Sequence, residues 1–118
     1  MDHFKLTQEL DGTAQLSLEE LVEHIIEWGN ARGIITNGTP QSQALKLMSE
    51  MGELADNLAK SRYKNALDDI GDCIVVLIMI ATQINTDITE CLRVAYDDIK
   101  DRKGYLNEDG IFIKEGDV

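Results

Sequence analysis

The sequence has few cysteines, histidines and aromatic residues, and these shortages narrow the kinds of site it can build. Its two cysteines, Cys73 and Cys91, make no disulfide framework and have no partner at metal-ligand spacing. The two histidines, His3 and His24, also lack a recognisable ligand spacing. Both cysteines lie in segments with apolar periodicity, so we expect buried free thiols in a reducing compartment.

Positive charge is also scarce. Lysine and arginine total 11 against 22 acidic residues, which gives a formal net charge of -11. Such a field repels nucleic-acid backbones and anionic membranes, so we expect neither as a partner. A small anionic substrate is still compatible with this charge, because a bound metal ion inverts the local potential.

Long hydrophobic runs are missing. The longest, Cys73 to Ala81, is far shorter than the ~20 residues that cross a bilayer. The N-terminus lacks the basic and apolar layout of a signal peptide. With 43% hydrophobic and 28% charged residues, the 118-residue chain has an ordinary globular composition. We therefore expect one soluble, cytoplasmic domain.

The apolar periodicity predicts four helices and a hairpin. Helices are expected from Ser17 to about Gly33, from Pro40 to about Lys60, from Asp68 to about Ile84, and from Asp87 to about Lys103. Ser17 and Glu20 have capping-box spacing, and Thr39 before Pro40 is an expected N-cap. The last of these helices should bury four apolar residues, namely Ile88, Leu92, Ala95 and Ile99. Loops are expected over Gly33–Thr39 and Ser61–Leu67, and a hairpin turns at Asn107–Gly110. Cys73 to Ala81 would also suit a buried strand, because it is rich in β-branched residues.

These elements predict an all-α fold. We expect a single domain over residues 1–118, with an arm at 1–16, a four-helix bundle at 17–104 and a β-hairpin tail at 105–118. The third helix is apolar on all sides and should be the most buried. A second subunit packing on the bundle would cover it, so we expect a homodimer or homotetramer.

Two acidic pairs stand out from the rest of the chain. Glu50 and Glu53 are three residues apart, and Asp69 and Asp72 repeat this interval after a spacer of fifteen residues. Residues at i and i+3 share one helix face, so each pair can aim two carboxylates at one point. Four converging carboxylates are the ligands that a hard divalent cation prefers. The pattern predicts a metal site between two helices.

Each pair also has an ordinary explanation. The glutamates could be solvated helix acids, and the aspartates could favour a helix N-terminus through the macrodipole. Asp72 argues for a site, because it directly precedes the apolar run and burying its charge is costly without a partner. Gly52 and Gly71 would permit a close approach of two helices around a metal ion.

The acidic motif resembles the MazG-like nucleoside triphosphate pyrophosphohydrolases, an all-α superfamily. The family pattern is E-E-x-x-E, a spacer, then E-x-x-D. This chain reads Ser49-Glu50-Met51-Gly52-Glu53 and then Asp69-Ile70-Gly71-Asp72. Trp28 in the first helix and Asp98 to Gly104 are similar to the small MazG-like proteins of phages and Gram-positive bacteria. The resemblance covers most of the chain.

The resemblance implies a fold, a reaction and a cofactor. The fold would be the MazG-type helical bundle. The reaction would convert a nucleoside triphosphate to the monophosphate and pyrophosphate, with Mg²⁺ (or Mn²⁺ as a substitute) held by Glu50, Glu53, Asp69 and Asp72. Glu50 and Glu53 would be the catalytic pair. Ser49 and Asp69 depart from the family pattern, since both stand where it has Glu. The alternatives are a non-catalytic helical module and an enzyme of this fold that acts on another substrate.

Five further residues are candidates for substrate binding. Lys46, one turn before Glu50, could contact a phosphate, or could simply pair with Glu50. Trp28 could stack on a base, or could belong to a core or an interface. The cations at the end of the last helix could bind phosphate or complement the helix dipole; they are Lys100, Arg102 and Lys103.

Overall fold

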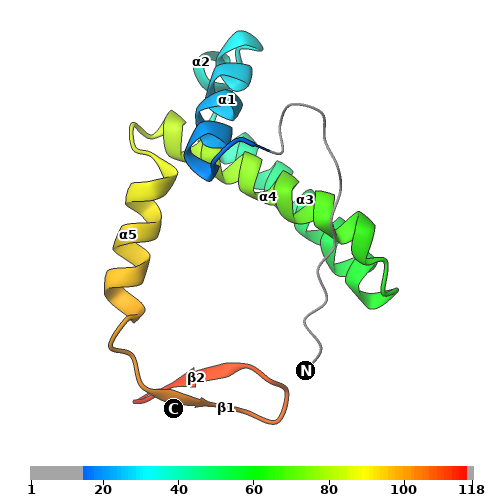
Figure 1. The fold of residues 1–118 in the computed structure, drawn as a ribbon, viewed down its shortest axis with the longest axis vertical. Coiled ribbons are helices and arrows are strands. Elements are labelled where there is room, and N and C mark those ends of the chain that lie inside the picture. The colour runs from blue at the N-terminus through cyan, green and yellow to red at the C-terminus, as the bar shows by residue number, and fades with distance from the viewer. Residues whose placement is uncertain (1–14, 117–118) are drawn as a thin grey trace. The chain divides into compact units, whose positions relative to one another are not determined.

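The computed structural model describes residues 15–116, which form five helices and one two-stranded antiparallel sheet (Figure 1). The helices are α1 (Leu18–Ala31), α2 (Ile34–Asn37), α3 (Pro40–Ala59), α4 (Tyr63–Gln83) and α5 (Ile88–Ile99). The strands are β1 (Gly104–Leu106) and β2 (Phe112–Lys114). The prediction of a mainly helical protein with a C-terminal hairpin is confirmed. Residues 1–14 of the expected arm lie outside the described residues.

The chain divides into two compact units, one up to Asp87 and one from Ile88 onward. The first holds α1 to α4, and the second holds α5 with the hairpin. Each unit is described by itself. The expected four-helix bundle over residues 17–104 would span both units, so it stays a prediction.

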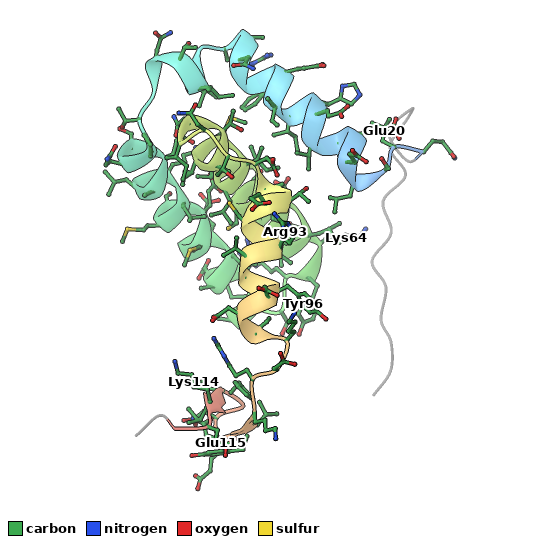
Figure 2. The ribbon with its side chains drawn as sticks, turned by 90° about the vertical axis from the view of Figure 1, so that its left-hand side faces the viewer. Glu20, Lys64, Arg93, Tyr96, Lys114 and Glu115 are labelled. Carbon is green, nitrogen blue, oxygen red and sulfur yellow. The ribbon has the colours of Figure 1, made fainter. Side chains whose placement is uncertain are left out.

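Helix α1 begins at the predicted capping box. The backbone N–H of Glu20 donates to Ser17 Oγ at 3.1 Å, and the N–H of Ser17 donates to Glu20 Oε1 at 3.2 Å. These two bonds satisfy donors that the first helical turn leaves open. Figure 2 labels Glu20 at this end of the helix. Further along, Gly29 is buried, and a Cβ added there would clash with the Met79 thioether. Glycine therefore permits the close packing of α1 on α4.

The expected loop over Gly33–Thr39 is wrong in part, because it contains the short helix α2. Gly33 stops α1 as predicted and adopts a positive φ of 72°, which glycine tolerates without strain. The side-chain amide of Gln83 then donates to the Ile34 carbonyl at 3.1 Å. This bond comes from a residue far away in sequence, so local patterns did not reveal the helix.

Helices α3 and α4 form an antiparallel helical hairpin and, of the elements within residues 15–116, share the largest contact (Figure 1). Thr39 caps α3 by accepting from the N–H of Ser42 at 3.1 Å, and Pro40 occupies the first turn, as predicted. The expected connection over Ser61–Leu67 is wrong from Tyr63 onward, and only Ser61 and Arg62 of it connect the helices. Helix α4 begins at Tyr63, because Ser61 takes a positive φ of 55° and reverses the chain within three residues. The alternative of a strand over Cys73 to Ala81 is also wrong, because this segment is helical.

Helix α4 supplies most of the core, as its apolar composition predicts. All five buried apolar side chains in residues 15–116 belong to it, namely Ala66, Val76, Ile78, Met79 and Ala81. However, α4 is not buried on all sides, because other large apolar side chains on it stay about half exposed. The helix therefore has one buried face and one open apolar face.

The second unit is small, and its residues are mostly exposed. Helix α5 ends at Ile99 rather than near Lys103, because Lys103 joins the hairpin by accepting the N–H of Glu115 at 2.6 Å. We expected α5 to bury Ile88, Leu92, Ala95 and Ile99, but the helix has no buried residue. The hairpin is confirmed, with Tyr105 opposite Ile113.

Candidate functional site

Glu50 is the first residue of the predicted site and the only buried residue of α3. Only 9% of it is exposed. Lys46 stands one turn earlier, and its Nζ lies 3.4 Å from Glu50 Oε1. The lysine side chain is itself 60% exposed, so this ion pair alone offsets little of the cost of burying the carboxylate. The ion pair between Lys46 and Glu50 that the spacing suggested is therefore present in the structure.

Asp69 is the second buried acid and lies on the facing helix α4. Its exposure is 6%, and the side-chain amide of Asn57 donates to its Oδ2 at 2.6 Å. This bond links the C-terminal part of α3 to the N-terminal part of α4. It fixes one carboxylate oxygen of Asp69 without neutralising the charge, because an amide is uncharged.

Asp72 is partly buried one turn after Asp69. Its burial, followed by the negative charges of Asp68, Glu50 and Asp69, raises the pKa of Asp72, while Lys46 opposes the shift. The same burial raises the pKa of the neighbouring Cys73 thiol. Mutual repulsion requires short separations, so carboxylates from both acidic halves lie near one another. The negative charges of Glu50 on α3 and of Asp69 on α4 therefore both act on Asp72.

Glu53, the fourth predicted ligand, has an exposed side chain on α3. Within residues 15–116, no three His, Cys, Asp or Glu side chains converge closely enough to hold an ion as they stand. Our reason for Gly52 and Gly71 is wrong for this chain, because a Cβ added at either would meet no atom within 4 Å.

Trp28 is 43% exposed, so it does not belong to the core of its unit. The Arg32 guanidinium lies over its ring, 5.2 Å from the centroid. A cation in this position is attracted to the negative face of the indole. The stacking of a base on this ring stays a prediction.

The basic residues Lys100, Arg102 and Lys103 lie in the second unit, where they are mixed with acids. Lys100 pairs with Asp97 at 2.8 Å, and Arg102 pairs with Asp98 at 2.6 Å. An open hollow of about 500 Å³ is lined by three acids and three cations, namely Asp98, Asp101, Glu115, Arg102, Lys103 and Lys114. Figure 2 labels Lys114 and Glu115 on the hairpin side of this hollow. The charges lining the hollow balance, so the hollow as a whole carries no excess of positive charge.

Asn57 is the site residue to which we assigned no role from the sequence. It lies on the same helical stripe as Lys46, Glu50 and Glu53, at the spacing of two turns from Glu50. That stripe was the available signal. The stripe did not reveal the role of Asn57, because its amide is uncharged and its hydrogen-bond partner, Asp69, lies on another helix.

Comparison with known proteins finds a phage relative. The chain is 40% identical over 70 residues to an uncharacterized 18.2 kDa protein from the rep-hol intergenic region of Haemophilus phage HP1. The similarity covers 59% of this chain and 43% of that protein, so the chain spans less than half the length of this relative. No family model matches the chain, and no solved structure matches it.

One further finding concerns membranes. Among residues 15–116, every helix is too short or too polar to reach across a bilayer.

Proposed function

We propose that this protein is a cytoplasmic, magnesium-dependent nucleoside triphosphate pyrophosphohydrolase with the MazG-type fold. It would convert a (d)NTP to the (d)NMP and pyrophosphate. One observation carries the proposal: two carboxylates are buried on helices that pack against each other, Glu50 on α3 and Asp69 on α4. Burying like charges together is costly, and a divalent cation is the common way to offset that cost. The resemblance of the acidic motif supports the same reaction.

The donor chemistry of the cluster suits Mg²⁺, with Mn²⁺ as a substitute. Glu50, Glu53, Asp69 and Asp72 would hold the ion through carboxylate oxygens, which are the ligands that hard cations prefer. Because Asn57 occupies Oδ2 of Asp69, the other oxygen of this carboxylate remains for the metal. When bound, the ion supplies charge neutralisation at the triphosphate and lowers the pKa of a water molecule.

The protein's own groups would divide the remaining tasks. The exposed carboxylate of Glu53 accepts a proton from the attacking water, and Glu50 orients that water. Lys46, whose ammonium group is largely exposed beside Glu50, can turn to a phosphate oxygen. Trp28 would stack on the base, and Lys100, Arg102 and Lys103 would contact phosphates. These last roles rest on the sequence alone.

The test is product analysis. The full chain is incubated with each common NTP and dNTP plus Mg²⁺ or Mn²⁺, and the products are separated. Monophosphate plus pyrophosphate, lost in Glu53→Gln, supports the proposal. Diphosphate plus orthophosphate contradicts cleavage between the α and β phosphates.

A second candidate function is a non-catalytic helical module that keeps the fold. Ser49 favours it, because it stands where the family pattern has an acid. The contacts from Lys46 to Glu50 and from Asn57 to Asp69 also favour it, because they give both buried acids a structural partner. Absence of any product, together with absence of metal binding by calorimetry, would select this candidate.

A further inference from the structure

Asn57 holds a buried carboxylate across the contact between α3 and α4. Its side-chain Nδ2 donates to Asp69 Oδ2 at 2.6 Å, and the bond is partly shielded from solvent. Asp69 itself is only 6% exposed, so little water is available to replace this donor. Because a buried acceptor without a donor is costly, the Asn57 amide fixes the orientation of the Asp69 carboxylate.

The two buried acids differ in the kind of group that holds them. Glu50 Oε1 lies 3.4 Å from the Lys46 ammonium, a cation that competes with a metal ion for the same carboxylate. The donor to Asp69 is a neutral amide, so this hydrogen bond orients the carboxylate and leaves its negative charge in place. Of the two contacts, the one from Asn57 is compatible with a bound cation.

The hydrogen bond also makes the two oxygens of Asp69 unequal. Oδ2 accepts from Asn57, whereas this bond leaves Oδ1 unused. A cation that bound both oxygens would compete with the amide for Oδ2. Calcium takes about six to eight oxygen ligands in a flexible geometry and accepts carboxylates through both oxygens, whereas magnesium is smaller and needs a near-octahedral arrangement. A carboxylate restricted to one oxygen therefore disfavours calcium more than magnesium.

We propose that Asn57 is a positioning residue that sets the cation preference of the acidic site by restricting Asp69 to ligation through Oδ1. The inference rests on the proposed function, because it concerns the ion held at the proposed metal site. Asn57 acts only through Asp69, as the hydrogen-bond partners of metal ligands commonly do. Without the amide, Asp69 can offer both oxygens, so the affinity for calcium rises relative to the affinity for magnesium.

Isothermal titration calorimetry of the full chain tests this role, with Mg²⁺ and Ca²⁺ titrated separately. The quantity compared is the dissociation constant for Ca²⁺ divided by the dissociation constant for Mg²⁺. Asn57→Ala should lower this ratio at least about tenfold, an effect of the size that loss of a metal ligand's partner has in other sites. A ratio equal to that of the wild type would overturn the inference, even if both affinities fell together.

Two further variants separate this role from a general loss of packing. Asn57→Leu replaces the amide by an apolar side chain of similar size, so it serves if Asn57→Ala does not fold, and the same fall in the ratio is expected. Val76→Ala removes buried apolar volume from α4 and leaves the bond to Asp69, so it should not change the ratio. Circular dichroism checks that each variant keeps its helices. An equal fall in the ratio for Val76→Ala would overturn the specific role of Asn57.

The outcomes distinguish failure of this inference from failure of the proposed function. If the ratio falls but no nucleotide is hydrolysed, the inference stands and the proposed reaction is wrong. If the wild type releases pyrophosphate and the ratio is unchanged, the reaction stands and the role of Asn57 is wrong. If the wild type binds neither cation, both are overturned.

Discussion

Acidic residues occur in two helical settings in this protein, and the settings differ in burial. On α5 the acids Asp97 and Asp98 are exposed, and each pairs with a cation three or four residues later. On α3 and α4, Glu50 and Asp69 are buried, and Asp69 is held by a neutral amide. In both settings the acidic residues follow the helical repeat, so their spacing alone does not distinguish a solvated helix face from a binding site. Burial of the charge does separate them.

The largest effect should follow from removing a buried acid. Glu50→Gln keeps the shape of the side chain but loses its charge, so we expect Mn²⁺ affinity and hydrolysis to fall at least about a hundredfold. Isothermal titration calorimetry measures the binding. Asp98→Asn makes the same chemical change on α5 and should leave the Mn²⁺ affinity unaltered. Equal losses in the two variants would erase the distinction between the settings.

The hydrogen bond between the helices should contribute the next largest effect. Asn57→Ala leaves the buried Asp69 carboxylate without its donor, and we expect a loss of about 1–3 kcal/mol in the free energy of unfolding. Urea denaturation measures it. Asn65→Ala removes an exposed amide of α4 and should change the unfolding free energy by less than about 0.5 kcal/mol. If both variants cost the same, the bond to Asp69 has no special role.

Asp72 should give a smaller effect that depends on pH. Because folding raises its pKa, the folded state binds a proton more readily than the unfolded state. The contribution of Asp72 to stability therefore falls as pH rises from the ordinary value of 3.8 through the raised pKa. Asp72→Asn removes this loss, so its Tm at pH 7 should exceed that of the wild type by a few degrees.

The gain from Asp72→Asn should vanish below pH 3.8, where the wild-type carboxyl is protonated in both states. Thermal melts across pH check this. A gain that is independent of pH would mean that the charge of Asp72 is not its cause. The same variant should bind Mn²⁺ more weakly, so that stability and function change in opposite directions.

The smallest effect concerns glycine. Gly52→Ala should stabilise α3 by about 0.5–1 kcal/mol, because alanine is the better helix former and the new methyl group meets open space. Urea denaturation detects the change. Destabilisation would show that another helix approaches Gly52 closely, and the acidic cluster would then be tighter than described.

The local signals in the sequence predicted most helix boundaries. The capping box at Ser17, the Thr39 cap with Pro40, and the hairpin turn all depend on neighbouring residues, and all three are confirmed. Helix α2 and the early start of α4 could not be predicted in this way. The first is supported by a bond from distant Gln83, and the second depends on a left-handed Ser61.

The sequence predicted which acidic residues belong to the candidate site, but not the contacts that support them. Spacing pointed to Glu50, Asp69 and Asp72, and in the structure the charges of the first two raise the pKa of Asp72. The spacing could not show which of these acids is most buried, because burial depends on how α3 packs against α4. For the same reason the position of Glu53 on the outer side of α3 was not foreseen.

The short reversal between α3 and α4 has a consequence for how the protein folds. Because only Lys60 to Arg62 separate the two helices, their contacts join residues close together in sequence, and such contacts form early. The carboxylates are thus brought together before distant parts of the chain, such as α1, have docked. Repulsion between the carboxylates should therefore slow the pairing of α3 with α4. Cations in the medium screen this repulsion and should accelerate that step.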